Sequence, residues 1–225
     1  MLTEGAKLPL FPLNTVLFPS MTLPLRIFEP RYRHMLDDCL SGEPIFGVAL
    51  IEEGLEVGKP AVPHEIGTTA RILGVEKKTA DLIYITTIGE ERFRVRRVLH
   101  NQPYLMGEVE PFPLAESDTP EVKALAERGT TLLSAYLELL SKALGAEIRL
   151  HRSPGDPQAV AYLTAMLLQV APPVKQRLLS IADLPSLLRE EAVLLDREDK
   201  ALSVMIQALE TGGPSRDADT PFSKN

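Results

Sequence analysis

The spacing of apolar residues changes near the middle of this chain of 225 residues. In the first half, short runs of β-branched and apolar residues recur roughly every ten residues, with turn residues between them. In the second half, apolar residues recur every three or four positions over long stretches, which is the period of an amphipathic helix. Strands followed by helices predict an α+β fold rather than an alternating α/β fold.

The first half predicts five short strands that curl into a barrel or sandwich. Turn residues are expected between them, including Gly89-Glu90. The predicted strands are Phe46 to Ile51, Thr69 to Val75, Leu82 to Ile88, Arg92 to Arg96, and Tyr104 to Val109. One helix interrupts this half. Pro30 suits its first position, and Ser41-Gly42 ends it.

The second half predicts helices that begin at recognisable caps. Thr119-Pro120-Glu121 has the pattern of an N-cap followed by a proline in the first turn, and Asp156-Pro157 repeats it. Pro172-Pro173 is predicted to stop the second of these helices. A short helix through Val174 to Ile181 and a long one from about Pro185 to Leu209 complete the set.

Composition limits the classes of protein that the chain can belong to. Hydrophobic residues make up 44% and charged residues 24%, which is usual for a globular protein that needs no cofactor or metal for stability. A single cysteine, Cys39, excludes an intrachain disulfide. The net charge of −7 is spread over both halves, so nucleic-acid binding is not expected without a local basic patch.

Two uncharged runs need to be tested as membrane spans. Leu8 to Leu25 contains four prolines, which forbid a continuous helix. Pro157 to Val174 contains polar residues and ends in two prolines, which favours a buried helix over a bilayer span. The N-terminus has no basic segment of the kind that begins a signal peptide. We therefore expect a cytoplasmic protein.

Catalytic and metal-binding patterns are lacking in the sequence. The four histidines show no spacing typical of metal ligands, and no cysteine cluster accompanies them; they are His34, His64, His100 and His151. No Gly-x-Ser-x-Gly elbow and no phosphate-binding loop occurs. Lys200 and Ser203 lie three positions apart on the last predicted helix, a spacing that arises often by chance. The sequence therefore predicts a protein that is not an enzyme.

Several blocks of the chain resemble one known protein family. The opening block is Leu8-Pro-Leu-Phe-Pro-Leu-Asn-Thr-Val-Leu-Phe-Pro19, followed by Leu23-Pro-Leu-Arg-Ile-Phe-Glu-Pro-Arg-Tyr32. The resemblance continues through Phe46 to Leu50, Ile66 to Ile72 and Gly89 to Val95, and more loosely through Val174 to Ile181. The matched blocks keep their order over about ninety residues. They resemble the Lon protease N-terminal (substrate-binding) domain family.

The resemblance implies a PUA-like β-barrel with one inserted helix, followed by a C-terminal helical bundle. The expected boundaries are 1–115 for the barrel, 116–210 for the bundle and 211–225 for a disordered tail. It also implies a stand-alone form that lacks the ATPase and peptidase domains. The expected partners are unfolded or extended polypeptides or a partner protein, and the oligomeric state stays open.

Two groups of residues are candidates for binding. Phe18, Met21 and Phe28 are candidates for peptide contact, because the proline-rich segments around them leave side chains available at a barrel rim. Glu29, Arg31 and Tyr32 form a second candidate group, in which a structural role is favoured: Glu29 suits the helix start, and Tyr32 begins the buried stripe.

The alternative function is RNA binding by the strand from Arg92 to Arg97. Period-two spacing places Arg92, Arg94 and Arg96 on one face, which suits phosphates. The favoured interpretation is an outward face whose charges are balanced by acids such as Glu90 and Glu91. A third hypothesis is a small hydrolase with a site that no motif reveals.

Overall fold

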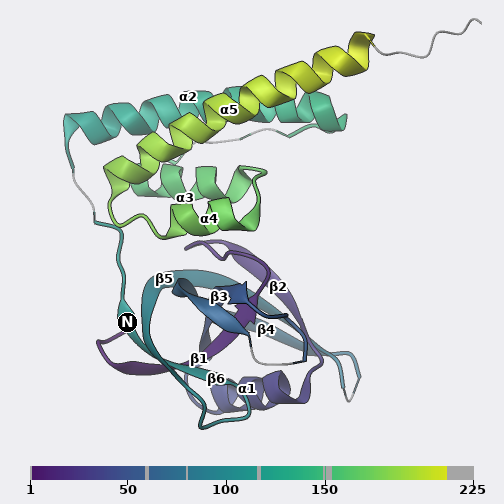
Figure 1. The fold of residues 1–225 in the computed structure, drawn as a ribbon, viewed down its shortest axis with the longest axis vertical. Coiled ribbons are helices and arrows are strands. Elements are labelled where there is room, and N and C mark those ends of the chain that lie inside the picture. Colours follow the sequence, from purple (N-terminus) through teal and green to yellow (C-terminus); the bar gives the residue numbers. More distant parts are fainter. Residues whose placement is uncertain are drawn as a thin grey trace, which may run out of the picture.

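The computed structural model describes residues 2–58, 61–79, 81–115, 118–148, 150 and 154–211. In these residues the chain forms a mixed sheet and five helices (Figure 1), so the predicted α+β class is confirmed. The strands are β1 (Ala6–Leu13), β2 (Thr22–Ile27), β3 (Ile45–Glu53), β4 (Val62–Lys77), β5 (Ile83–Leu99) and β6 (Leu105–Pro111). The helices are α1 (Pro30–Ser41), α2 (Pro120–Leu144), α3 (Pro157–Leu167), α4 (Pro172–Leu179) and α5 (Leu184–Thr211).

The sheet closes on itself. Its strand order is β2-β5-β4-β3-β1-β6, and β5 also pairs with β6. The long strand β5 makes this closure: its first part pairs with β2 and its second part with β6, while β4 runs beside both parts. β1 and β3 are parallel, and the other pairs are antiparallel. Closure leaves β2 as the strand with an open edge among the described strands.

Two prolines lie inside β1, where a strand with neighbours on both sides normally excludes them. The register explains how they are accommodated. Residues Ala6 to Leu10 pair with β6, and Leu10 to Leu13 pair with β3. Pro9 and Pro12 therefore each stand in a part of β1 that has one partner strand, so the missing N–H can fall on the unpaired side.

The turn predicted at Gly89-Glu90 is wrong, because β5 continues through it. Gly89 instead permits a close approach of the segment before β2. The Ser20 N–H donates to the Gly89 carbonyl at 2.8 Å, and the Gly89 N–H donates to the Met21 carbonyl at 2.9 Å. A Cβ at position 89 would lie 2.2 Å from the Phe18 carbonyl oxygen, so a side chain cannot be accommodated there.

The predicted helix starts are confirmed. Pro30 is the first residue of α1, and the Thr119 and Asp156 side chains accept backbone N–H groups at the starts of α2 and α3. One predicted helix end is wrong: α3 ends at Leu167, and Pro172 with its neighbour begins α4. Proline suits a first helical turn, where its missing N–H has no intrahelical acceptor.

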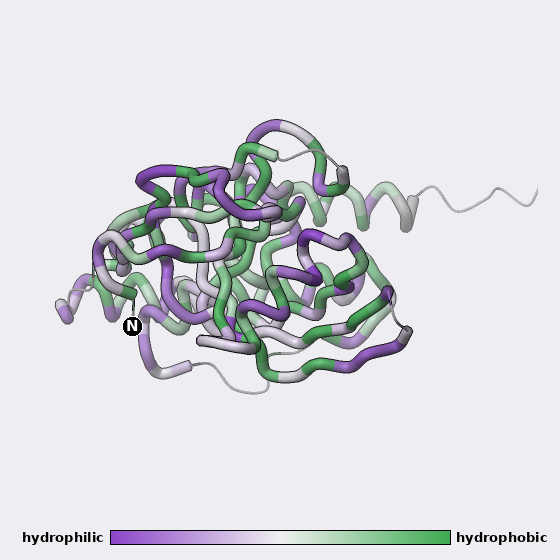
Figure 2. The backbone as a smooth tube through the Cα atoms, turned by 90° about the horizontal axis from the view of Figure 1, so that it is seen from below, coloured by the Kyte–Doolittle hydropathy of each residue, from purple (hydrophilic) through white to green (hydrophobic). Residues whose placement is uncertain are grey.

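The elements are stacked in layers. α1 lies at one end of the sheet, α3 and α4 lie at the other end, and α2 and α5 cross beyond them (Figure 1). One apolar core joins the sheet to α1. Another joins the four later helices to Leu50 and Ile66 of the sheet and to Phe18 in the segment before β2. Hydrophilic and hydrophobic residues are mixed along most segments (Figure 2), as expected for elements with one buried face.

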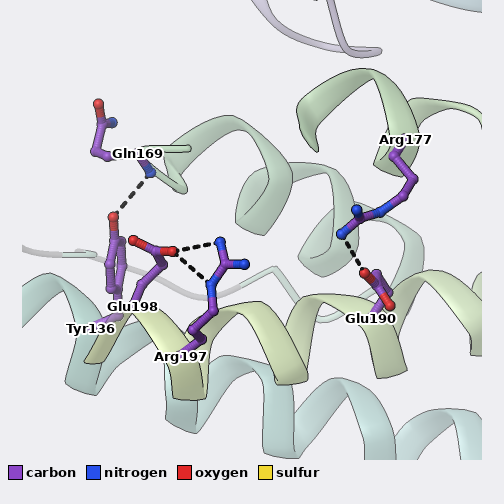
Figure 3. Close-up of polar contacts among 6 residues, drawn as sticks. All are labelled: Tyr136, Gln169, Arg177, Glu190, Arg197 and Glu198. Carbon is purple, nitrogen blue, oxygen red and sulfur yellow. Dashed lines mark hydrogen bonds and ion pairs between the residues drawn. The ribbon is translucent and has the colours of Figure 1, made fainter. Parts of the chain in front are cut away.

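Polar contacts fix the later helices relative to one another (Figure 3). The Tyr136 hydroxyl on α2 accepts the N–H of Gln169 at 3.0 Å, which ties down the connection between α3 and α4. Arg177 of α4 pairs with Glu190 of α5 at 2.7 Å. α4 is therefore tied directly to α5, and the segment before it is tied to α2.

The remaining predictions concern membrane spans, the C-terminal tail and the domain boundary. No helix among the described residues combines the length and apolarity that a membrane crossing requires. The predicted tail, 211–225, lies outside the described residues except for Thr211, which ends α5. The domain boundary between residues 115 and 116 stays a prediction, and so does the assignment of the sheet as a PUA-like barrel.

Candidate functional site

Glu29, Arg31 and Tyr32 lie together at the start of α1. Arg31 Nη2 is 3.1 Å from Glu29 Oε2, and both side chains are 15% exposed. The Arg31 guanidinium lies over the Tyr32 ring at 4.5 Å, and that ring packs on Phe11 with 4.1 Å between centroids. Burial, partly offset by Arg31, raises the pKa of Tyr32 to about 12. The charges in this cluster are therefore paired.

The same cluster holds the loop that follows β3. The Gly58 N–H donates to Glu29 Oε2 at 3.2 Å, and Arg31 Nη2 donates to the Glu56 carbonyl at 3.4 Å. The Asn14 amide donates to the Glu56 carboxylate at 3.0 Å. Glu29 and Arg31 thus connect the start of α1 to a loop about 25 residues later in the chain, which is a structural role.

The three apolar candidates do not share one surface. Phe18 is fully buried, and Met21 is partly buried against both cores. The prediction that Phe18 is a rim residue is wrong, because its side chain is packed in the core that includes the later helices. Phe28 is 49% exposed.

Phe28 lines an open hollow that we call the α1 cleft. Its volume is about 250 Å³, and its walls include Phe11, Leu25, Phe28, Glu29, Tyr32 and Val57. Val57 is 54% exposed. The structure thus brings three of the six candidates to one cleft, Phe28, Glu29 and Tyr32, and adds Val57 from the loop after β3.

A second hollow, the sheet–helix groove, lies between the closed sheet and α3. Its volume is about 450 Å³. Its apolar walls come from the segments before β1 and before β2, from the end of β6 and the residues after it, and from α3. They are Leu2, Pro19, Pro111, Pro113, Leu114 and Tyr162. The polar lining consists of Glu90, Glu91, Arg92 and Gln158.

Arg92 is buried where the sheet meets the helices, with 3% of its surface exposed. Its Nη1 donates to the carbonyls of Leu179 and Ile181, each at 2.7 Å, at the end of α4. The guanidinium lies over the Phe112 ring at 4.8 Å. Among the described residues, its Nε and Nη2 have no hydrogen-bond partner. Burial lowers the pKa of Arg92.

The other arginines of β5 do not form an open stripe for phosphates. Arg94 lies over the same Phe112 ring at 4.6 Å. Arg96 pairs with Glu110 at 2.6 Å, and Arg97 pairs with Glu108 at 2.7 Å. The predicted outward face is wrong at Arg92, and the balancing acids come from β6 rather than from Glu90 and Glu91. This arrangement does not support RNA binding.

Comparison with known proteins places this geometry in a family. The family model of the ATP-dependent protease La (LON) substrate-binding domain matches residues 7–197, which include all of the closed sheet except Ala6 and most of the helices. The chain belongs to this family.

Relatives and solved structures agree with the assignment. Lon protease 2 of Syntrophobacter fumaroxidans is 28% identical over 207 residues, which is 88% of this chain and 25% of that protein. A Lon N-terminal domain protein from Xanthomonas campestris is 31% identical, with a TM-score of 0.59, and the match covers 82% of this chain and 96% of that one. The N-terminal domain of a Mycobacterium avium complex Lon protease shares the fold at a TM-score of 0.65 and 22% identity, over 85% and 98% of the two chains. The chain spans about a quarter of the length of the curated relatives it matches.

The match to Lon covers the substrate-binding domain and not the catalytic region. In the described residues of this family member, no group of three or more metal-ligating side chains comes together. Lys200 pairs with Asp196 at 2.6 Å rather than with Ser203. His151 lies outside the described residues.

Two buried charges were missed by the sequence reasoning. Arg92 was predicted to lie on an outward face. Glu191 adjoins Glu190 in the sequence, and such a carboxylate pair is predicted to be solvated charge on a helix face. Glu191 is in fact 2% exposed, and neither of its carboxyl oxygens has a partner among the described residues. Burial raises the pKa of Glu191 well above its usual value. The available signal for Glu191 was its position among Leu187, Leu188 and Leu195 in the helical period.

Proposed function

We propose that this Lon-family chain binds extended or unfolded polypeptides and does not cleave them. The observation that carries the proposal is the family match over residues 7–197, because that family is defined as the substrate-binding region of Lon. The α1 cleft supports it, since a half-exposed phenylalanine beside an apolar hollow suits an apolar side chain of a bound segment.

Within this proposal, the PUA-like barrel presents the clefts and the helical bundle supports it. The setting would be protein quality control in the cytoplasm, where unfolded segments expose apolar side chains. Phe28 and Val57 would contact the polypeptide directly. Glu29, Arg31 and Tyr32 would hold the cleft in shape through the contacts that fix the loop after β3.

Fluorescence titration with an unfolded protein tests the proposal. A reduced and carboxymethylated protein, labelled with a fluorophore, is expected to bind with a Kd in the micromolar range, and its native, disulfide-bonded form is expected not to bind. Absence of binding at tens of micromolar would falsify the proposal.

Variants of exposed residues locate the surface. Phe28→Ser with Val57→Ser is expected to weaken binding about tenfold or more, because both anchors are removed. Val193→Ser on α5 is the matched control: Val193 is 65% exposed but lies outside both clefts. Equal binding by the two variants would remove the α1 cleft from the proposal.

A further inference from the structure

We propose that the sheet–helix groove takes the carboxylate end of an extended polypeptide, and that Arg92 is the residue that binds this carboxylate. The inference rests on the proposed function and deepens it, since it names the part of the polypeptide that is recognised. It adds a second contact site to the α1 cleft, which lies at the other end of the sheet near α1.

The first step of the argument is the geometry of the free donors. Nη1 of Arg92 is occupied by the two carbonyls at the end of α4. The remaining donors, Nε and Nη2, form one edge of the planar guanidinium, and two parallel N–H groups on one edge match the two oxygens of a carboxylate. Both donors lack a partner among the described residues.

The second step is charge. The acceptors of Arg92 are neutral carbonyls, and the structure gives it no carboxylate partner among the described residues. A buried cationic donor without an acceptor is costly, so a ligand that supplies an anionic acceptor gains more than one that supplies a neutral carbonyl. A carboxylate is therefore favoured over an internal peptide carbonyl.

Neither acid in the groove is a hydrogen-bond partner of Arg92. Glu90 pairs with Arg71 through Oε1, and Glu91 accepts the Leu2 N–H at 2.8 Å. Each of these carboxylates therefore already has a donor or a cation beside it. Both residues immediately precede Arg92 in β5, and Glu91 lies beside Leu2.

The third step is the shape and lining of the groove. A volume of about 450 Å³ lies within the range of ordinary ligand sites, which suits the last few residues of a polypeptide. The walls are mostly proline, leucine and tyrosine side chains, so the residues before the carboxylate should be apolar. Solvent does not reach Nε or Nη2 in this state. Binding therefore requires a wall side chain to move aside, a change that is common at interfaces.

The experiment compares two forms of one labelled peptide with an apolar end: one with a free C-terminal carboxylate and one with a C-terminal amide. Fluorescence anisotropy with the full chain is expected to show binding about tenfold tighter for the free acid. In Arg92→Met this preference should disappear. In Arg92→Lys it should be reduced, because lysine keeps the charge but loses the paired donors.

Two further variants separate recognition from folding. Gln176→Met is the matched control: Gln176 is 4% exposed and donates across the same boundary to the Ile66 carbonyl at 2.9 Å, but it does not line the groove. It is expected to keep the preference for the free acid. Gln158→Trp places a large side chain in the groove from α3 and leaves Arg92 itself unchanged. It is expected to abolish the preference for the free acid, and it provides a test even if Arg92→Met does not fold.

The outcomes distinguish the two proposals. Equal binding of acid and amide by the unchanged protein overturns the carboxylate site and leaves polypeptide binding standing. A preference that survives Gln158→Trp overturns the groove as its location. A preference that Gln176→Met removes as fully as Arg92→Met assigns Arg92 a structural role only. No binding of either peptide or of the unfolded protein overturns both proposals.

Discussion

The charges buried at the start of α1 and those buried under the later helices are handled in opposite ways. At α1, Arg31 has Glu29 beside it at 3.1 Å. Under the helices, Arg92 is held by neutral carbonyls, and Glu191 has no partner among the described residues. Paired charges of the first kind contribute to a fixed structure. Unpaired ones of the second kind cost stability.

The largest expected effect tests whether the helical end depends on the sheet for its core. Phe18→Ala should lower the free energy of unfolding by about 3–5 kcal/mol, because it empties a fully buried site in the core shared by the sheet and helices. Urea denaturation followed by circular dichroism measures this loss. A change under about 1 kcal/mol would mean that the two ends of the molecule are energetically independent.

Glu191 gives the next largest effect, in the opposite direction. Its pKa is raised in the folded protein by burial, so the native state holds a proton that the unfolded chain releases above its ordinary carboxyl pKa. The contribution of Glu191 to stability is therefore complete at acidic pH and is lost as pH rises toward the raised folded pKa.

Glu191→Leu should remove this loss and stabilise the protein at pH 8 by about 1–3 kcal/mol, the cost of an unsatisfied buried group. Thermal unfolding between pH 4 and pH 8 measures it, with Glu190→Leu as the control, since Glu190 is partly exposed and paired with Arg177. If the difference in stability between Glu191→Leu and the unchanged protein is the same at every pH in this range, the raised pKa of Glu191 is contradicted.

Arg31→Met should cost about 1–3 kcal/mol at pH 7. It removes the partner of Glu29 and the contact with the Glu56 carbonyl, and so loosens the loop after β3. Urea denaturation gives the loss, and hydrogen exchange at Gly58 reports on the loop itself. If exchange at Gly58 stays slow, the Glu29 contact alone holds the loop.

The smallest effect on stability belongs to Phe28→Ser, which should change the free energy of unfolding by no more than about 0.5 kcal/mol. Phe28 is half-exposed, so its loss leaves no cavity. Phe18→Ala and Phe28→Ser compare the loss of a phenylalanine from a fully buried position and from a half-exposed one. A large destabilisation by Phe28→Ser would indicate that the α1 cleft is part of the core rather than a binding surface.

The change of apolar period was enough to predict the α+β class, and local capping patterns placed the helix starts. These features are local, because a proline or a cap residue acts within one helical turn. Gly89 shows where local reasoning fails. A glycine that ends a strand and one that lets another segment cross it look alike in sequence, and only the contact with Phe18 distinguishes them.

The binding candidates were predicted less well for the same reason. The periodicity of β5 places Arg92 on one face of the strand, but it cannot show that α4 lies over that face. Phe18 and Phe28 occur in similar proline-rich surroundings, yet the first is buried and the second is half-exposed. Burial of this kind depends on segments far apart in the chain.

The closed sheet has a consequence for biosynthesis. β1 is synthesised before its partners β3 and β6, and its second partner appears only at Leu105–Pro111. Until then, β1 and the second part of β5 present unpaired edges that can capture other chains. A translation pause shortly before β6 would therefore prolong the most aggregation-prone stage of this protein's synthesis.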